Sequence, residues 1–368
     1  MAHCKKKVLY LPSTPLNVLV SVAHASVFSE QQTSEIVLID QKRLKNNLYY
    51  DALNAWKDTP FEKVSLTLGQ AKGWRKIVER KRNFRELKCL FEGFQPDVIA
   101  VGSDRRVEFQ YLMHLCQHTN PAVEGWYLDD GLYSYSGRPY KSIKDGVNSL
   151  LKKISYGFWW QEPKTVGASD WIKRVWLFQP KYAMTILQAK NCETLEPKWF
   201  TSAQIKNFSK VVASTCQMHA LELQMLGTVG VFLLIPHPNN IKKMSGYEGR
   251  IFKFLDSLKQ KGISVAVKYH PRTVQEDPLG FIEKYGALLL PSSLAFEYVL
   301  PFLKQGAYII GDVGTALLTA QWLRPDLNVF AVLAENDAFQ ASFKNIYAQL
   351  DLRVVAEFKD IHVSRTAS

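Results

Sequence analysis

The stretch Trp126-Tyr127-Leu128-Asp129-Asp130-Gly131 decides how we interpret the fold of this chain. An apolar run ends in two adjacent carboxylates, and a glycine follows that lets the backbone turn. A strand feeding a loop would place Asp129 and Asp130 at its carboxyl end, where open α/β sheets carry their chemistry. Adjacent carboxylates repel, so we expect one to hold its proton more tightly than usual, as a general base requires. Two solvated aspartates at an ordinary turn are the alternative that this stretch alone leaves open.

The segments before this stretch alternate between strand and helix patterns, which is typical of a doubly wound sheet. Strands are predicted over 8–11, 35–39 and 96–102, and helices over 16–28 and 106–118. Thr14 is the predicted N-cap of the first helix, with Pro15 at its first position. Ser103 and Asp104 are predicted to cap the second helix, whose N-terminus would face the same edge as the paired aspartates.

The length of 368 residues predicts two domains, because a single core seldom exceeds about 250–300 residues. We expect domains over 1–200 and 227–350, and a C-terminal tail over 351–368 that returns to the first domain. In the second domain the patterns predict strands over 229–236, 263–268, 287–290, 308–310 and 328–332, and helices over 249–261, 295–304 and 316–322. The sequence therefore predicts two α/β domains with a cleft between them.

The amino-acid composition limits the kinds of molecule that the chain can be expected to bind. The formal net charge is +12, which implies an anionic partner such as nucleic acid, a phosphorylated substrate or an acidic membrane surface. No recognised nucleic-acid motif is present, so we expect no nucleic-acid partner. The five cysteines are scattered without metal-ligand spacing, which suits a reducing cytosol. We see no signal peptide and no apolar window long enough to span a membrane.

A histidine ends one strand of the second domain. The strand over 263–268 runs through Tyr269 into His270-Pro271-Arg272, and an imidazolium beside Lys268 and Arg272 would suit a phosphate. A second pair, His237-Pro238, also follows a strand and competes with the first on sequence alone.

A glycine turn and a hydroxyl residue form a further anion-binding pattern. The run 309–315 reads as a strand, a glycine turn and Thr315 at a helix start, which would present backbone N–H groups and a hydroxyl to an anion. An ordinary threonine N-cap, which stabilises a helix by about 1 kcal/mol, is the alternative. No glycine run matches a Walker loop or a dinucleotide fingerprint, and no His/Cys/Asp cluster has metal-ligand spacing.

The order of these motifs resembles that of bacterial sialyltransferases, most closely the lipooligosaccharide sialyltransferase and capsule polysialyltransferase families. The matching motifs are Ser13-Thr14-Pro15-Leu16, Gly102-Ser103-Asp104-Arg105, Asp129-Asp130-Gly131, His270-Pro271, Glu297 and the hydroxyl residue Thr315. They cover nearly the whole chain, but each is short, so the resemblance depends on their order and spacing. Where the family has two adjacent hydroxyl residues this chain has Gly314 first, so it lacks the hydroxyl for one hydrogen bond to phosphate.

The resemblance implies an inverting glycosyltransferase of the GT-B class, with two Rossmann-like domains facing each other across a cleft. It would move sialic acid from CMP-sialic acid to a hydroxyl of a lipooligosaccharide or capsule glycan, and it would need no metal. It would also need no cofactor, because the CMP-sugar is itself a substrate. Asp130 or Asp129 would be the general base, and His270 would protonate or hydrogen-bond the leaving phosphate. The other implied site residues are Thr315, Gly314, Glu297, Lys268 and Pro271 on the nucleotide side, and Thr14, Asn17, Ser103 and Gly131 on the donor or acceptor side. The first domain would bind the acceptor and the second the CMP-sugar.

Two other functions remain open on the sequence alone. The same scaffold could transfer another CMP-linked ulosonic acid, such as pseudaminic acid, legionaminic acid or Kdo, or the chain could be a non-catalytic basic protein that binds nucleic acid or membrane. The aromatic and basic segment 133–182 suits a surface that contacts lipid headgroups or a sugar acceptor, or else a helical pair with buried tryptophans. We expect a cytoplasmic protein with a peripheral contact at the inner membrane.

Overall fold

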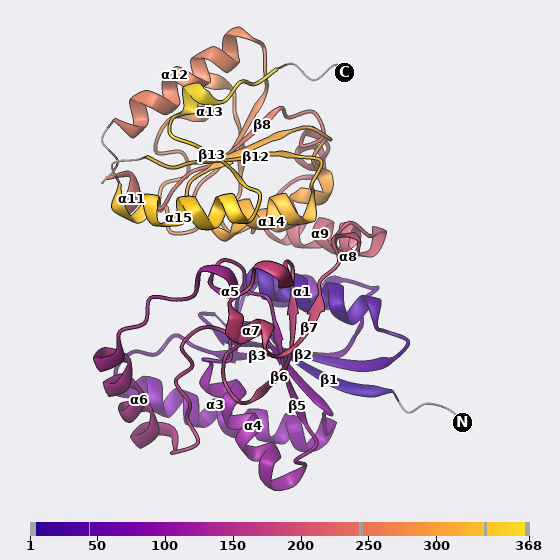
Figure 1. Cartoon of the computed structure of the whole chain (residues 1–368). Helices are drawn as coiled ribbons and strands as arrows, with labels where there is room; N and C mark the ends of the chain where they lie inside the picture. The colour runs from indigo at the N-terminus through magenta and orange to yellow at the C-terminus, as the bar shows by residue number, and fades with distance from the viewer. Residues whose placement is uncertain (1–4, 44, 243, 245, 335–336, 365–368) are drawn as a thin grey trace. The chain divides into compact units, whose positions relative to one another are not determined.

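The chain forms two α/β units, which divide after Trp199 (Figure 1). The computed structural model describes residues 5–364 except 44, 243, 245, 335 and 336. The division lies one residue before the expected end of the first domain. The helices between 200 and 226, which we left between the domains, belong to the second unit.

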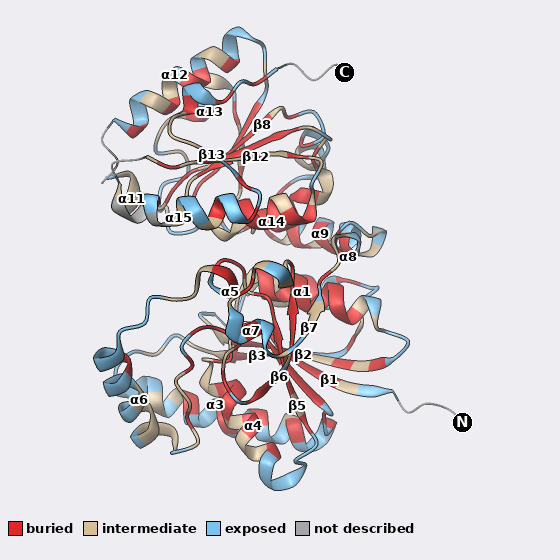
Figure 2. Ribbon diagram, in the orientation of Figure 1, coloured by how far each residue is buried: buried red, intermediate tan, exposed pale blue. Residues whose placement is uncertain are grey.

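The first unit is built on a seven-stranded parallel sheet with strand order β3-β2-β1-β4-β5-β6-β7. Its strands are β1 (Lys6–Leu11), β2 (Gln32–Gln41), β3 (Phe61–Leu68), β4 (Val98–Val101), β5 (Glu124–Leu128), β6 (Ile172–Leu177) and β7 (Asn191–Thr194). The central strands are apolar and almost wholly buried, as parallel strands covered on both faces must be (Figure 2). The strand predicted from the Trp126 stretch is β5.

Helices cover both faces of this sheet. They are α1 (Pro15–Val27), α2 (Leu48–Ala55), α3 (Trp74–Phe94), α4 (Val107–Thr119), α5 (Tyr133–Ser136), α6 (Ser142–Tyr156), α7 (Thr185–Gln188) and α8 (Pro197–Phe200), which crosses the division. Figure 1 shows α1 on one face and α3 and α4 on the other. The crossovers from β1 and from β4 run in opposite directions along the sheet, so their right-handed helices fall on opposite faces. The order therefore reverses between β1 and β4, where such sheets bind their ligands.

The second unit repeats this design with six parallel strands in the order β10-β9-β8-β11-β12-β13. The strands are β8 (Val231–Leu234), β9 (Val265–Lys268), β10 (Leu288–Leu290), β11 (Tyr308–Gly311), β12 (Asn328–Val332) and β13 (Arg353–Val355). The helices are α9 (Ala203–Thr215), α10 (Ala220–Met225), α11 (Pro238–Ile241), α12 (Tyr247–Gln260), α13 (Phe281–Tyr285), α14 (Thr315–Leu323) and α15 (Ala338–Gln349). Its order reverses between β8 and β11.

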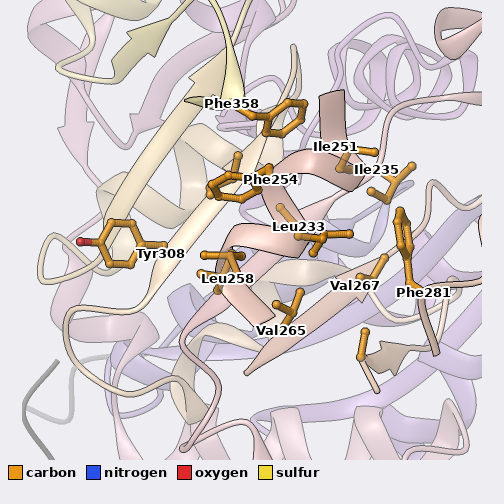
Figure 3. Close-up of a cluster of buried hydrophobic side chains, with 14 of the residues drawn as sticks. Leu233, Ile235, Ile251, Phe254, Leu258, Val265, Val267, Phe281, Tyr308 and Phe358 are labelled. Carbon is orange, nitrogen blue, oxygen red and sulfur yellow. The ribbon is translucent and has the colours of Figure 1, made fainter. Parts of the chain in front are cut away.

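The core of the second unit also includes the end of the chain. Phe358 packs with Tyr247 and Phe254 of α12, and Ile361 and Val363 belong to the same buried cluster (Figure 3). The expected return of the tail 351–368 to the first domain is therefore wrong for its described part. Residues 353–355 pair with β12 as β13, and the apolar residues that follow bury themselves in the nearest core.

The helix predicted over 295–304 is also wrong. Two 3₁₀ turns take its place, over Phe296–Tyr298 and Leu300–Phe302. Pro301 lacks a backbone N–H and its ring clashes with the preceding turn, so a continuous α-helix through this position is destabilised by about 3 kcal/mol.

No helix in the described part of the chain is long and apolar enough to cross a bilayer.

Candidate active site

In the first unit the site is built where the carboxyl ends of β1, β4 and β5 lie side by side. The loop after β1 carries Thr14, and Asn17 lies in the first turn of α1. Asp130 follows β5, and its Oδ1 accepts a 2.8 Å hydrogen bond from Asn17 Nδ2 and a 3.3 Å bond from Thr14 Oγ1. The structure thus brings together three of the predicted site residues from the two sides of the sheet's reversal point.

Asn17 is held in place by its own surroundings. It is buried, and its backbone N–H donates to Thr14 Oγ1, the predicted N-cap of α1. Gly102, at the end of β4, lies against the Asn17 side chain so closely that a Cβ would stand 2.1 Å from Asn17 Cγ. Any other residue at 102 would push Asn17 away from Asp130. The contact between Asn17 and Asp130 therefore requires glycine at this position.

The surroundings of Asp130 set its acidity. Burial raises the pKa of Asp130 to about 6, while the Asn17 hydrogen bond and the charge of Arg106 act in the opposite direction. Asp129 contributes to the rise only as a smaller effect, so burial is the main cause rather than the carboxylate repulsion that we expected. Asp130 is half-buried, and among the described residues its side-chain partners use Oδ1, which leaves Oδ2 to accept a proton.

Asp129 has a different environment. It is fully buried, and its two oxygens accept hydrogen bonds from four donors: Gly131 N at 2.9 Å, Ser134 Oγ at 2.6 Å, Phe178 N at 3.1 Å and the Tyr135 hydroxyl. These bonds tie the turn after β5 to α5 and to the end of β6. Asp129 therefore orders the loop, and Gly131 makes the turn with φ +98°.

The residues of the predicted motif Gly102-Ser103-Asp104 have different roles. Ser103 is half-buried at the end of β4. The predicted cap is wrong for both Ser103 and Asp104, because the N-cap of α4 is Arg106 and no side chain caps this helix. Asp104 is instead buried, and accepts from Gly167 N at 2.8 Å and Ser169 N at 2.7 Å. It holds the loop before β6 against the end of β4.

A basic cavity of about 450 Å³ lies near this site in the first unit. Its polar wall includes Arg80, Arg105, Arg106 and Lys152. Arg80 and Arg106 both pair with Asp40 at the end of β2. Arg106 also lowers the pKa of Asp130, so it lies within electrostatic reach of that carboxylate. The sequence carries no signal for this role, because Arg106 there marks only the start of a predicted helix.

In the second unit, the two histidines that competed on sequence are neighbours. His237 follows β8 and His270 follows β9, and these strands pair directly. The ring centroids lie 4.8 Å apart with the planes at 65°. Both rings are half-buried, and each is followed by a proline. The choice between His237 and His270 is therefore a choice between two members of one pair.

Each imidazole is oriented by a backbone N–H of its own loop. Asn239 N donates to His237 Nδ1 at 3.0 Å, and Arg272 N donates to His270 Nδ1 at 3.1 Å. With Nδ1 as the acceptor, the proton of each neutral ring lies on Nε2. Burial lowers the pKa of His270, and the charges of His237, Arg272 and Lys268 lower it further. His270 is thus a neutral hydrogen-bond donor near pH 7.

The glycine-hydroxyl motif lies at the start of α14, next to the end of β11. Gly314 is the N-cap and Thr315 the first helical residue. Gly314 N donates to the Tyr347 hydroxyl at 2.7 Å, and this hydroxyl donates back to Gly314 O at 3.2 Å. Tyr347 of α15 fixes the loop, a role that sequence analysis missed. Thr315 and Ala316 are half-buried at the start of α14, whereas Leu317 and Leu318 in the same turn are buried.

Glu297 and Lys268 are buried behind these loops. Glu297 is 7% exposed and accepts from Thr319 Oγ1 at 3.1 Å, and burial raises its pKa. Lys268 is 8% exposed and donates to Ser292 O at 3.2 Å, and burial lowers its pKa to about 8. Pro271 is exposed on the loop beside His270. Of the predicted nucleotide-side residues, Lys268 and Glu297 are thus the deepest.

The cavity at the carboxyl ends of β8, β11 and β12 is small. It measures about 20 Å³, and Ile235, Pro236, Gly311 and Asp312 contribute to its wall. Such a volume holds about one water molecule. A nucleotide would therefore have to lie on the loops at the strand ends and not inside this cavity. No group of three His, Cys, Asp or Glu side chains among the described residues is arranged to hold a metal ion.

No protein-family model matches the sequence, and no curated protein is similar enough to it to be identified as a relative. Solved structures match over nearly the whole chain. An α/β-galactoside α-2,3-sialyltransferase from Photobacterium phosphoreum has a TM-score of 0.58 at 12% identity, covering 98% of this chain and 100% of its own. A sialyltransferase from Photobacterium damsela has a TM-score of 0.54 at 10% identity, with coverages of 96% and 82%. A UDP-GlcNAc 2-epimerase from Methanocaldococcus jannaschii has a TM-score of 0.55 at 11% identity, with coverages of 98% and 93%.

These matches and the two parallel sheets confirm the predicted fold class. The chain has the GT-B fold of two Rossmann-like domains. Because sialyltransferases and epimerases match almost equally well at such low identity, the likeness by itself assigns the fold and no reaction.

Proposed function

We propose that this chain is a metal-independent, inverting glycosyltransferase that moves a sialic acid from CMP-sialic acid to a hydroxyl of a cell-surface glycan. The single observation that carries the proposal is the environment of Asp130. A half-buried carboxylate with its pKa raised to about 6 is held by Asn17 and Thr14 at the reversal point of the first sheet. Such a group is ionised at pH 7 and still basic enough to accept a proton in a transition state.

Asp130 acts as the base in this proposal, and Asp129 does not. Asp129 already accepts four hydrogen bonds, so a proton placed on it would break the loop's own contacts. Asp130 Oδ1 is fixed by Asn17, and Oδ2 takes the proton of the acceptor hydroxyl as its oxygen attacks the anomeric carbon. The bond from that carbon to the phosphate oxygen breaks, CMP leaves, and attack from the opposite face inverts the configuration.

The second unit supplies the stabilisation of the leaving phosphate. His270 offers Nε2–H as a hydrogen-bond donor, and Thr315 adds its hydroxyl at the positive end of α14. The lowered pKa of His270 makes imidazolium scarce at neutral pH, so hydrogen bonding to the departing phosphate is favoured over proton donation. Glu297 is the candidate for the ribose hydroxyls, in the role that the resemblance implies. The chain's positive charge suits a donor that carries both a phosphate and a carboxylate.

The acceptor is proposed to be a lipooligosaccharide or capsule glycan, on the motif resemblance alone. A transferase for pseudaminic acid, legionaminic acid or Kdo would use the same base and the same phosphate contacts, and differs only in the sugar pocket. The matching epimerases of the same fold are named for the substrate UDP-GlcNAc. A preference for a cytidine or a uridine nucleotide therefore distinguishes the proposed transferase from an epimerase.

Calorimetry with CMP and with UDP tests the nucleotide, and we expect CMP to bind more tightly. Hydrolysis and transfer assays across several CMP-linked ulosonic acids then identify the donor. UDP binding with epimerisation of UDP-GlcNAc would overturn the proposal, as would salt-sensitive DNA binding without any CMP binding. A chelator should leave the transfer rate unchanged, and strong inhibition would contradict the metal-independent mechanism.

A further inference from the structure

Helix α6 (Ser142–Tyr156) turns its apolar side outward. Ile143, Val147, Leu150, Leu151 and Ile154 are 86%, 55%, 55%, 56% and 68% exposed. Figure 2 shows the helix largely in the colour of exposed residues. At 3.6 residues per turn these side chains share one arc of roughly 100°. An ordinary surface helix buries such a stripe, so α6 is inverted with respect to the usual pattern.

The polar side of α6 is the side that holds it to the protein. Asp145 is the helix's one buried residue, and it pairs with Arg138 at 3.1 Å. Lys152 pairs with Glu162 at 3.1 Å and lies 4.0 Å from the ring centroid of Trp160. These ion pairs fix the orientation of the helix, so the outward stripe is a consequence of specific contacts.

The surroundings of the stripe are basic. Lys144 and Lys153 follow the arc on its two sides at helical spacing, and the one acidic residue of the helix, Asp145, faces inward. Phe158, just beyond the helix, is 81% exposed and extends the apolar surface. By contrast Trp160, Trp171 and Trp176 are buried, and Trp159 is half-buried and stacks on His114, so the tryptophans of the segment 133–182 pack against the protein.

We propose that the exposed stripe of α6 is a docking surface for an anionic lipid bilayer, with the helix lying in the plane of the membrane interface. The apolar side chains would enter the boundary between headgroups and acyl chains, and Lys144 and Lys153 would contact lipid phosphates. A helix of this length measures about 22 Å, too short to span a bilayer but sufficient to lie on one. This inference uses neither Asp130 nor the histidine pair, and it does not depend on the donor sugar.

The charges favour a bilayer over a second copy of the chain. Lys144 and Lys153 flank the stripe on opposite sides, and a second copy of α6 would bring the same two cations to the contact with no acidic side chain to pair them, because Asp145 faces inward in each copy. Like charges across an otherwise apolar contact are destabilising, whereas lipid phosphates neutralise both lysines.

Sedimentation with vesicles tests the proposal. The wild-type chain should bind vesicles that contain about one third phosphatidylglycerol and should bind pure phosphatidylcholine much less. The triple variant Ile143→Ser/Leu150→Ser/Ile154→Ser and the double variant Lys144→Glu/Lys153→Glu should each lose binding to the anionic vesicles by at least roughly tenfold. Lys152 is not the residue to reverse, because its ion pair with Glu162 faces inward.

Matched variants elsewhere on the surface serve as controls. Leu221 and Val274 are 73% and 99% exposed, so Leu221→Ser/Val274→Ser removes apolar surface outside α6. Lys57→Glu/Lys253→Glu makes the same change of charge at two exposed lysines outside α6. Both controls should bind as the wild type does, and circular dichroism should show every variant folded. Equal vesicle binding by the α6 variants would overturn the proposal. So would a wild-type dimer in sedimentation equilibrium that the same α6 variants dissociate, because the stripe would then be an interface between copies.

Discussion

Asn17 Nδ2 donates a 2.8 Å hydrogen bond to Oδ1 of Asp130, although 113 residues separate the two in sequence. The bond joins the first turn of α1 to the loop after β5 across the reversal point of the first sheet. It orients the carboxylate and at the same time opposes the rise of its pKa that burial causes. The catalytic proposal depends on this pair more than on any other contact.

Removing the Asn17 amide should shift the pH dependence of the reaction. Activity requires ionised Asp130, so kcat/KM should rise with pH through about 6 in the wild type. Asn17→Ala removes a hydrogen bond that favours the ionised form, so this acid limb should move up by roughly one pH unit. Ser13→Ala, which touches Asn17 and not Asp130, is the control and should leave the limb in place. If the acid limb of kcat/KM does not move in Asn17→Ala, the group whose ionisation controls activity is not the carboxylate that Asn17 contacts.

Asp129 should matter for stability where Asp130 matters for activity. Asp129→Ala leaves buried donors around Gly131, Ser134 and Phe178 without their acceptor, so the free energy of unfolding should fall by about 3 kcal/mol. In Asp130→Asn a carboxylate whose pKa is raised by burial loses its charge, so stability at pH 7 should be unchanged or higher. Urea denaturation of both variants measures this difference. Equal stability of the two would contradict the division of roles.

Gly102→Ala tests whether the position of Asn17 is important. The new Cβ would lie 2.1 Å from Asn17 Cγ, so the amide must move. We expect kcat/KM to fall by roughly tenfold to a hundredfold. Gly93→Ala, at an exposed helix position where nothing lies within 4 Å of the added Cβ, should keep full activity and gain about 0.5–1 kcal/mol of stability. Full activity in Gly102→Ala would show that the site tolerates displacement of Asn17.

The two histidines should differ in the size of their effects. His270→Ala should lower kcat by roughly 10²–10³-fold, as loss of a donor to the leaving phosphate does. His237→Ala should cost about tenfold or less, because it removes a neighbour of the donor. His270→Asn, whose amide can still donate, should recover part of the rate. The reverse order, with His237→Ala the more damaging, would assign the phosphate contact to His237.

Much of this site could be predicted from the sequence because the end of an apolar run shows where a strand ends. The apolar run before Asp129 and Asp130, and those before His237 and His270, place each group at a strand's carboxyl end. What could not be predicted is which ends become neighbours. The contact of Asn17 with Asp130 depends on β1 and β5 flanking β4, and the pairing of the two histidines depends on β8 lying beside β9.

The errors also have physical causes. The helix expected around Glu297 fails at Pro301, which breaks it into 3₁₀ turns. The tail was expected to return to the first domain because β13 is only three residues long and shows little strand pattern in the sequence. The apolar residues that follow β13 are buried in the core of the second unit. Asp104 looked like a helix cap, but its hydrogen-bond partners Gly167 and Ser169 lie more than sixty residues away.

The most direct test of the catalytic claim is to measure transfer from CMP-sialic acid by Asp130→Asn together with its affinity for CMP. The account predicts that kcat/KM falls by roughly 10²–10⁴-fold, the contribution of a general base, while the Kd for CMP by calorimetry stays within about twofold. A variant that keeps most of its transfer activity, or that loses CMP binding in step with activity, would contradict the assignment of Asp130 as the base.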